Sequence, residues 1–188
     1  MFHNSKNEKL VEEVLREERV RFLCRSPPVT VSRSIPLSEV VELLRQEAAA
    51  CVVVVESDDD GEDRPAEVDE ASASRPRPVG IFTERDYLDK LVTLEPADWL
   101  NVKYNPVERH MTANLKLLSM DAPLGKAIQL MTKRGYRHLP IVDDKGELFG
   151  VISARDIVVY LAEHFPMEIY NRPPTRDQEQ IFDSREGG

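Results

Sequence analysis

The sequence is poor in the residues that catalytic and metal sites usually require, with two cysteines, eight glycines and four histidines among 188 residues. Cys24 and Cys51 stand too far apart for a metal-binding or redox pair, and Cys51 lies in a valine run typical of a buried strand. So few glycines leave no glycine-rich loop for phosphates, and no serine, cysteine or carboxylate has a recognisable base partner. These shortages predict that the protein is not an enzyme.

Long hydrophobic runs and positively charged stripes are also absent. No apolar stretch approaches the roughly 20 residues that cross a bilayer, and residues 1–6 lack the hydrophobic run of a secretory signal. We therefore expect a cytoplasmic protein without membrane contact. The formal net charge is −9, and no basic stripe is present to cover phosphates, which argues against nucleic-acid binding.

Most of the negative charge lies in one segment. Residues 56–70 hold nine acidic residues and one arginine, a net charge of −8, and this composition favours disorder. The spacing of Glu56 and Glu67 approaches that of a calcium-binding loop. However, Asp63 stands where a hydrophobic residue is expected and Pro65 interrupts the exit, so no metal requirement is predicted.

A seven-residue pattern occurs twice in the chain. Residues 80–86 (GIFTERD) return seventy positions later as residues 150–156 (GVISARD). In both copies a glycine and two apolar residues precede a hydroxyl, and an aspartate preceded by arginine follows. That order is expected where a strand leads directly into a helix.

The duplication extends upstream with a different offset. Residues 35–44 match residues 122–131 at an offset of 87, and both have one apolar helical face. At the same offset, residues 51–55 match residues 138–142, and both are predicted to be buried strands. The change of offset from 87 to 70 locates an insertion in the first copy, within residues 56–78.

Each half is therefore predicted to run strand, helix, strand, strand, helix, an α/β (α+β) arrangement with a small mixed sheet in each half. The first strands are expected at residues 29–31 and 115–118, and the final helices are expected to begin at Thr83 and Ser153. The predicted regions are an amphipathic helix in residues 1–23 (apolar periodicity from residue 8), a first copy at 24–94, a linker at 95–106, a second copy at 107–165 and an extended tail at 166–188.

The ordered duplication resembles a tandem pair of cystathionine-β-synthase (CBS) domains over about residues 20–165. The resemblance is carried by the two glycine-led patterns, by residues 107–112 (VERHMT) and by residues 135–143 (GYRHLPIVD). The first copy departs from the family pattern at residues 24–26 (CRS), opposite residues 111–113 (MTA), and at the acidic insertion. The resemblance implies two repeats related by a pseudo-two-fold axis, and a pair that usually forms a homodimer.

Both patterns contain a hydroxyl and a carboxylate three residues apart, Thr83 with Asp86 and Ser153 with Asp156. Taken singly, each pair is typical of a capping box at the start of a helix. A cap does not require the preceding Arg85 and Arg155, which could supply charge to a phosphate. In the alternative interpretation, backbone N–H groups and the hydroxyl bind phosphate, and the carboxylate accepts hydrogen bonds from ribose hydroxyls.

The CBS resemblance implies that these positions bind AMP, ADP or ATP in clefts between the copies. S-adenosylmethionine or NAD is the alternative ligand. The candidate ligand-binding residues are Pro28, Thr83, Arg85, Asp86, Leu115, Arg137, His138, Pro140, Ser153, Arg155 and Asp156. Arg137 and His138 align with Ala50 and Cys51, so phosphate-rich ligands should favour the cleft that the basic pair reaches; alternatively, His138 simply points into polar surroundings.

Two functions remain open from the sequence. The first is a stand-alone regulatory module, a homodimer that binds an adenosine nucleotide and signals to a separate, unidentified protein. The second is a protein-interaction or scaffolding module whose clefts are empty or hold another ligand. Apolar residues on the final helices could serve a dimer interface or the core, namely Leu88, Leu91, Val158 and Leu161.

Overall fold

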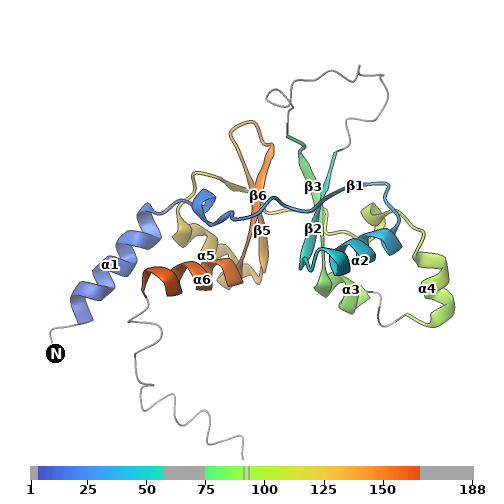
Figure 1. The fold of residues 1–188 in the computed structure, drawn as a ribbon, viewed down its shortest axis with the longest axis horizontal. Helices are drawn as coiled ribbons and strands as arrows, with labels where there is room; N and C mark the ends of the chain where they lie inside the picture. Colours follow the sequence, from blue (N-terminus) through green and yellow to red (C-terminus); the bar gives the residue numbers. More distant parts are fainter. Residues whose placement is uncertain (1–3, 57–74, 91, 93, 166–188) are drawn as a thin grey trace, which may run out of the picture.

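Two three-stranded sheets, one from each half of the chain, form the centre of the molecule (Figure 1). The computed structural model describes residues 4–56, 75–90, 92 and 94–165. The greater part of the predicted acidic insertion and calcium-loop match, the predicted tail and Leu91 lie outside the described residues.

The first sheet has the strand order β1-β2-β3. Its elements in chain order are β1 (Thr30–Ser32), α2 (Leu37–Gln46), β2 (Cys51–Val55), β3 (Pro78–Thr83) and α3 (Glu84–Lys90). β1 and β2 are parallel and joined through α2, whereas β2 and β3 are antiparallel. The four valines of β2 are all buried, because this central strand is covered on both faces.

The second sheet repeats this topology with the order β4-β5-β6. Its elements are β4 (Leu118–Ser119), α5 (Leu124–Arg134), β5 (His138–Val142), β6 (Leu148–Ser153) and α6 (Ala154–His164). The pairing again changes from parallel to antiparallel, and the register shifts at Ile141/Val142, which matches the shift at Val54/Val55 in the first sheet. The predicted order of elements in both halves is confirmed.

Two predictions about element boundaries are wrong. The helix expected through residue 23 is α1 (Asn4–Glu17), followed by a 3₁₀ turn, η1 (Val20–Leu23). The helix stops because the Val20 and Arg21 N–H groups donate to the carbonyls of Ala122 and Met120, which belong to the second half. The strand expected at residues 115–118 is reduced to β4, because the Leu115 N–H turns back to the Ala113 carbonyl.

The linker between the halves contains a short helix, α4 (Pro96–Val102), and leads into a second 3₁₀ turn, η2 (Val107–Arg109). Figure 1 shows α1 and α4 at opposite ends of the molecule. The backbone N–H groups of Leu37 and Ser38 donate to the carbonyls of Asn105 and Lys103 at 2.9 Å, which attaches the linker to the start of α2.

The opening segments of the two halves are exchanged. Val20 and Leu23 precede the first sheet but are buried in the core of the second half, while Val107 precedes the second sheet and is buried in the core of the first half. The exchange brings a sulfur-containing side chain against each pattern glycine. A Cβ built on Gly150 would lie 2.7 Å from the Cys24 Sγ atom, and one on Gly80 would lie 2.1 Å from the Met111 Sδ atom. Only glycine therefore fits at these two positions without displacement of a neighbour.

The two sheets contact each other through β2 and β6. Val53 and Val55 form a small apolar cluster with Leu148, against which Val151 packs. The Leu148 N–H also donates to the Pro76 carbonyl at 2.9 Å. The halves thus share an apolar contact between the sheets in addition to the exchanged segments, and the surfaces beside this contact are hollowed into clefts.

Candidate functional site

Two clefts between the halves contain the repeated polar pattern. The larger, which we name the Asp86 cleft, has a volume of about 670 Å³, and the smaller, the Asp156 cleft, has a volume of about 330 Å³. Both volumes fall near the range that small-molecule sites occupy. The Asp86 cleft takes residues 83–86 from the first half and residues 135–138 from the second. The Asp156 cleft takes residues 25–29 and 48–51 from the first half, with Ser153 and Asp156 from the second.

The start of α6 forms a complete capping box at the Asp156 cleft. The Asp156 N–H donates to the Ser153 Oγ atom at 3.2 Å, while the Ser153 N–H and hydroxyl each donate to Asp156 Oδ2 at 2.7 Å. Among the residues that the structure describes, no hydrogen-bond donor contacts the other carboxylate oxygen, Oδ1. The capping interpretation is confirmed here, and it uses only one of the two oxygens.

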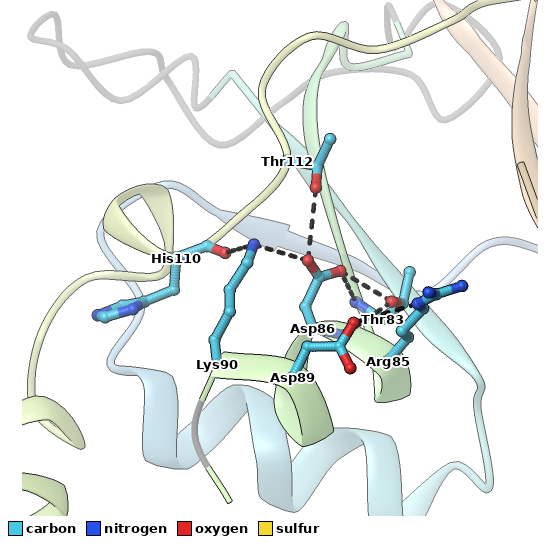
Figure 2. A network of polar contacts seen from close by, with 7 residues as sticks. All are labelled: Thr83, Arg85, Asp86, Asp89, Lys90, His110 and Thr112. Carbon is cyan, nitrogen blue, oxygen red and sulfur yellow. Dashed lines mark hydrogen bonds and ion pairs between the residues drawn. The ribbon is translucent and has the colours of Figure 1, made fainter. Parts of the chain in front are cut away.

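The start of α3 has the same cap at the Asp86 cleft. The Thr83 N–H donates to Asp86 Oδ2 at 3.1 Å, the Thr83 hydroxyl donates to it at 2.8 Å, and the Asp86 N–H donates to Thr83 Oγ1 at 3.2 Å. Here the second oxygen is occupied. The Lys90 ammonium donates to Asp86 Oδ1 at 2.7 Å, and the Thr112 hydroxyl approaches the same oxygen at 3.4 Å (Figure 2).

The ionisation of Asp86 reflects these contacts. Burial raises the pKa of this carboxyl, but hydrogen bonds from Lys90 and Thr83, together with the Lys90 charge, outweigh burial and hold the pKa below its ordinary value. Asp86 is therefore an anion at neutral pH. Lys90 also donates to the His110 carbonyl at 2.9 Å, so one ammonium links α3 to the segment that enters the second half.

Basic residues are unequally divided between the clefts. Arg137 and Arg85 line the Asp86 cleft, where the Arg85 Nε atom pairs with Asp89 at 3.1 Å. In the Asp156 cleft, Arg25 forms a bidentate ion pair with Glu163, in which the Arg25 Nη1 atom lies 3.0 Å from Glu163 Oε1. The larger cleft thus has two arginines and the smaller has one, but Glu84, Asp86 and Asp89 also line the larger cleft and offset their charge. Of these arginines, Arg85 and Arg25 are each paired with a carboxylate.

His138 lines both clefts, because β5 lies between them. Burial lowers the pKa of His138; Asp156 and Glu84 oppose this shift, and Arg137 adds to it. The imidazole is therefore uncharged at neutral pH. The Cys51 thiol also lies in the Asp156 cleft, where burial raises its pKa to about 12, so it stays protonated and unreactive.

The structure gathers most of the predicted site residues and leaves three aside. The Asp86 cleft contains Thr83, Arg85, Asp86, Arg137 and His138, and the Asp156 cleft contains Pro28, His138, Ser153 and Asp156. The residues that line neither of these two clefts are Leu115, Pro140 and Arg155. Pro140 is buried in β5 opposite Val151, and Arg155 is exposed on α6. A ligand-binding role for these three stays a prediction.

Sequence reasoning missed the contributions of Thr112, Tyr136 and Lys90. Thr112 and Tyr136 line the Asp86 cleft, and the Lys90 ammonium donates a hydrogen bond to the Asp86 carboxylate. A signal for Lys90 was present, because it stands four residues after Asp86 on the same helical face. The signal for Thr112 was weaker: it aligns with Arg25 at the offset of 87, at the position where the first copy departs from the family pattern.

Comparisons with known proteins identify the class to which this fold and these clefts belong. The CBS domain family model matches residues 18–66 and 107–163, one match in each half. The chain belongs to the CBS domain family, and it contains a pair of these domains. An uncharacterised 17.7 kDa protein of Acidianus ambivalens is 36% identical over 95 residues, which cover 50% of this chain and 54% of that protein. The chain spans less than two thirds of the length of the curated relatives it matches.

Solved structures share the fold. A CBS domain protein of Pyrobaculum aerophilum complexed with AMP has a TM-score of 0.57 and 23% identity, over 78% of this chain and 99% of that chain. The CBS domain pair of protein MJ0100, in complex with 5′-methylthioadenosine and S-adenosyl-L-methionine, has a TM-score of 0.58 and 21% identity, over 78% of this chain and 98% of that one. Within residues 4–56, 75–90, 92 and 94–165, no helix has the length and apolar character needed to cross a bilayer.

Proposed function

We propose that the chain is a regulatory CBS pair that binds an adenosine nucleotide, AMP, ADP or ATP, in the clefts between its repeats. The observation that carries this proposal is the Asp156 carboxylate, which uses Oδ2 for the cap and has no donor on Oδ1 from the described residues. A ribose diol could donate to this oxygen. The N–H groups of the first turn of α6, an eleven-residue helix, favour a phosphate nearby.

The ligands named for the two related structures support an adenosine moiety. They are AMP in one CBS protein, and S-adenosyl-L-methionine with 5′-methylthioadenosine in another. These molecules share the adenine and the ribose, and they differ in what the 5′ position carries. The common part of the ligand is therefore best matched by Asp86 and Asp156, and the variable part by the residues that distinguish the clefts.

The volume of the Asp86 cleft and its two arginines favour it for phosphate-rich ligands. It has about twice the volume of the Asp156 cleft, and Arg137 and Arg85 line it. A planar guanidinium is well matched to phosphate oxygens. We expect ADP or ATP to favour the Asp86 cleft and AMP to fit either.

Calorimetric titration with AMP, ADP, ATP and S-adenosylmethionine tests the proposal. We expect dissociation constants in the micromolar range. Asp86→Asn and Asp156→Asn should each weaken binding at their own cleft by about tenfold, because each removes the charge from a hydrogen-bonded carboxylate. Asp144→Asn, in the exposed turn before β6, is the matched control and should leave the affinities unchanged. Absence of heat with all four ligands would contradict the proposal.

Arg137→Ala separates the phosphate contribution from the rest of the site. Arg137 lines the Asp86 cleft together with the exposed Gly135. Because its guanidinium would contact phosphate oxygens, its loss should weaken ATP binding more than AMP binding. Equal affinities of the variant and the wild type for both nucleotides would remove Arg137 from the proposed phosphate site.

We also propose that the pair forms a homodimer and acts on a separate regulated protein. Leu88 on α3 and Val158 on α6 occupy equivalent positions and are 58% and 61% exposed. Leu161, by contrast, packs against the core of the second half. Light scattering should report a dimer for the wild type and a monomer for Leu88→Asp combined with Val158→Asp; a wild-type monomer would exclude the dimer.

The scaffolding alternative has a separate test. If partner binding does not depend on a nucleotide, the double variant Asp86→Ala with Asp156→Ala should retain it. A regulated partner that responds to the nucleotide should lose that response in the same variant.

A further inference from the structure

We infer that Lys90 is an internal competitor for the ligand of the Asp86 cleft, and that it weakens the hold of Asp86 on a ribose relative to that of Asp156. This inference rests on the proposed function, because it concerns the ligand that the two carboxylates would bind. It assigns to Lys90 a role in setting affinity that the repeated pattern alone does not contain.

The competing contact is fully formed in the structure. Figure 2 shows the Lys90 side chain rising from α3 between the Asp86 carboxylate and the His110 carbonyl, at Nζ distances of 2.7 and 2.9 Å. Asp86 Oδ2 is used by the cap, and Oδ1 is used by Lys90, with Thr112 at 3.4 Å. A ribose hydroxyl that donates to Oδ1 must therefore displace the ammonium or share the oxygen with it.

The second repeat lacks this competitor. The residue four positions after Asp156 is Tyr160, whose side chain is buried in the second core and whose ring stacks on His164 at 4.0 Å. Arg25, the residue equivalent to Thr112, is held by Glu163. The same hydroxyl and carboxylate motif is thus engaged by a lysine in one cleft, while in the other the described residues leave Asp156 Oδ1 without a donor.

The exposure of the pair determines the size of the effect. The Lys90 side chain is 43% exposed and that of Asp86 is 14% exposed, so solvent screens the pair on the lysine side. Partly exposed ion pairs contribute modestly to stability. A competing contact reduces the apparent affinity of a ligand in proportion to the fraction of molecules in which the site is open. We expect removal of the ammonium to strengthen binding at the Asp86 cleft by about fivefold.

Displacement of Lys90 would also have a structural consequence. The same ammonium holds the His110 carbonyl, and His110 lies in the segment that leads from η2 to Thr112. Thr112 pairs with Ile81 of β3 through two backbone hydrogen bonds, of 2.8 and 3.1 Å. A ligand that removes Lys90 from Asp86 therefore also removes a contact between α3 and the segment that joins the repeats. The ligand would therefore interact differently with the arrangement in which Lys90 contacts Asp86 and the arrangement in which it does not. A shift in the populations of two arrangements requires such a difference.

The test is calorimetric titration of the full chain in an Asp156→Asn background, in which the Asp86 cleft is the one with an intact carboxylate. Lys90→Met keeps the length of the side chain and removes its charge. The probes are adenosine, which carries no phosphate that Lys90 could bind, and AMP. We expect adenosine to bind about fivefold more tightly to the Lys90→Met protein than to its parent. Lys126→Met, an exposed lysine on α5, is the matched control and should have no effect.

The outcomes separate this inference from the proposed function. If Asp156→Asn weakens wild-type binding as proposed but Lys90→Met leaves adenosine affinity unchanged or weakens it, the competitor role is wrong and the proposed function stands. Tighter adenosine binding combined with weaker AMP binding would support competition at the ribose and show a second contact to phosphate. If neither the wild type nor the Lys90→Met protein binds any of the adenosine ligands, both are overturned. Circular dichroism of each variant establishes that it is folded.

Discussion

The two clefts begin from the same cap and differ in what surrounds it. Asp86 and Asp156 hold their helix starts with the same three hydrogen bonds, to the backbone and hydroxyl of Thr83 and of Ser153. The cleft around Asp86 is larger, has two arginines in its lining, and has a carboxylate that Lys90 already engages, whereas no donor from the described residues reaches Asp156 Oδ1 in the smaller cleft. The comparison teaches that the cap is part of the fold and that the two clefts differ in the residues around it.

The largest expected effect concerns the two glycines at which the exchanged segments contact the sheets. A Cβ at position 150 would lie 2.9 Å from the Cβ of Cys24, an atom whose position the backbone fixes, as well as 2.7 Å from its sulfur. The three atoms nearest a Cβ at position 80 are side-chain atoms of Met111 beyond its own Cβ, at 2.1–2.9 Å, and these can move. We expect Gly150→Ala to lower the free energy of unfolding by about 3 kcal/mol and Gly80→Ala by about 2 kcal/mol, measured by urea denaturation.

Double variants sharpen this difference. Met111→Ala removes all three atoms that crowd position 80, so it should recover part of the loss in the Gly80→Ala protein. Cys24→Ala leaves the Cβ that crowds position 150, and it should recover less. Equal recovery in the two repeats would show that the exchanged segments are equally adaptable and would contradict this reading of the contacts.

A smaller effect is expected at the caps. Ser153→Ala removes the acceptor of the Asp156 N–H and one of two donors to the Asp156 carboxylate, and should cost about 1 kcal/mol of stability. Thr83→Ala should cost less, about 0.5 kcal/mol, because Lys90 and Thr112 still hold Asp86 in place. Thermal or urea unfolding measures both variants, with Ser153→Thr and Thr83→Ser as controls that keep a hydroxyl. A greater loss at Thr83 would contradict the proposed support from Lys90.

The smallest effect is a pH dependence confined to the Asp86 cleft. The pKa of Asp86 is held below its ordinary value in the folded state, so the unfolded chain binds a proton more readily. Its contribution to stability is complete above the ordinary pKa of an aspartate, about 3.9, and is lost as the pH falls through the lower folded-state value. The difference in urea midpoint between the wild type and Lys90→Met should therefore be constant near neutral pH and shrink in acid. A difference that persists below that range would place the effect of Lys90 elsewhere.

Much of the fold could be predicted because the local sequence pattern occurs twice in the chain. Residues 51–55 and 138–142 are β2 and β5 as expected, and α3 and α6 begin directly after Thr83 and Ser153. The errors lie where a segment bonds to the other half. Backbone contacts to residues 120–122 stop the helix before Val20, and no periodicity within residues 1–23 contains that information.

The candidate site was predictable in its chemistry and not in its distribution. The hydroxyl and carboxylate pairs and the basic residues Arg137 and His138 were visible in the sequence. Which cleft the basic pair would reach depends on how the sheets pack, and the structure places Arg137 on the Asp86 cleft and His138 on both. The contact between Lys90 and the His110 carbonyl depends in addition on the path of the linker, which no local pattern specifies.

The exchanged opening segments also bear on how such a chain can be divided. Val20 and Leu23 complete the second core, and Val107 completes the first. A fragment ending in the linker would expose Val20 and Leu23, which have no second core to enter, and its own core would lack Val107. The complementary fragment would have the converse defects. The indivisible unit of folding is thus the pair, and a cut between the halves should yield two pieces that are stable only when mixed. Loss of one repeat would leave the other with an incomplete hydrophobic core.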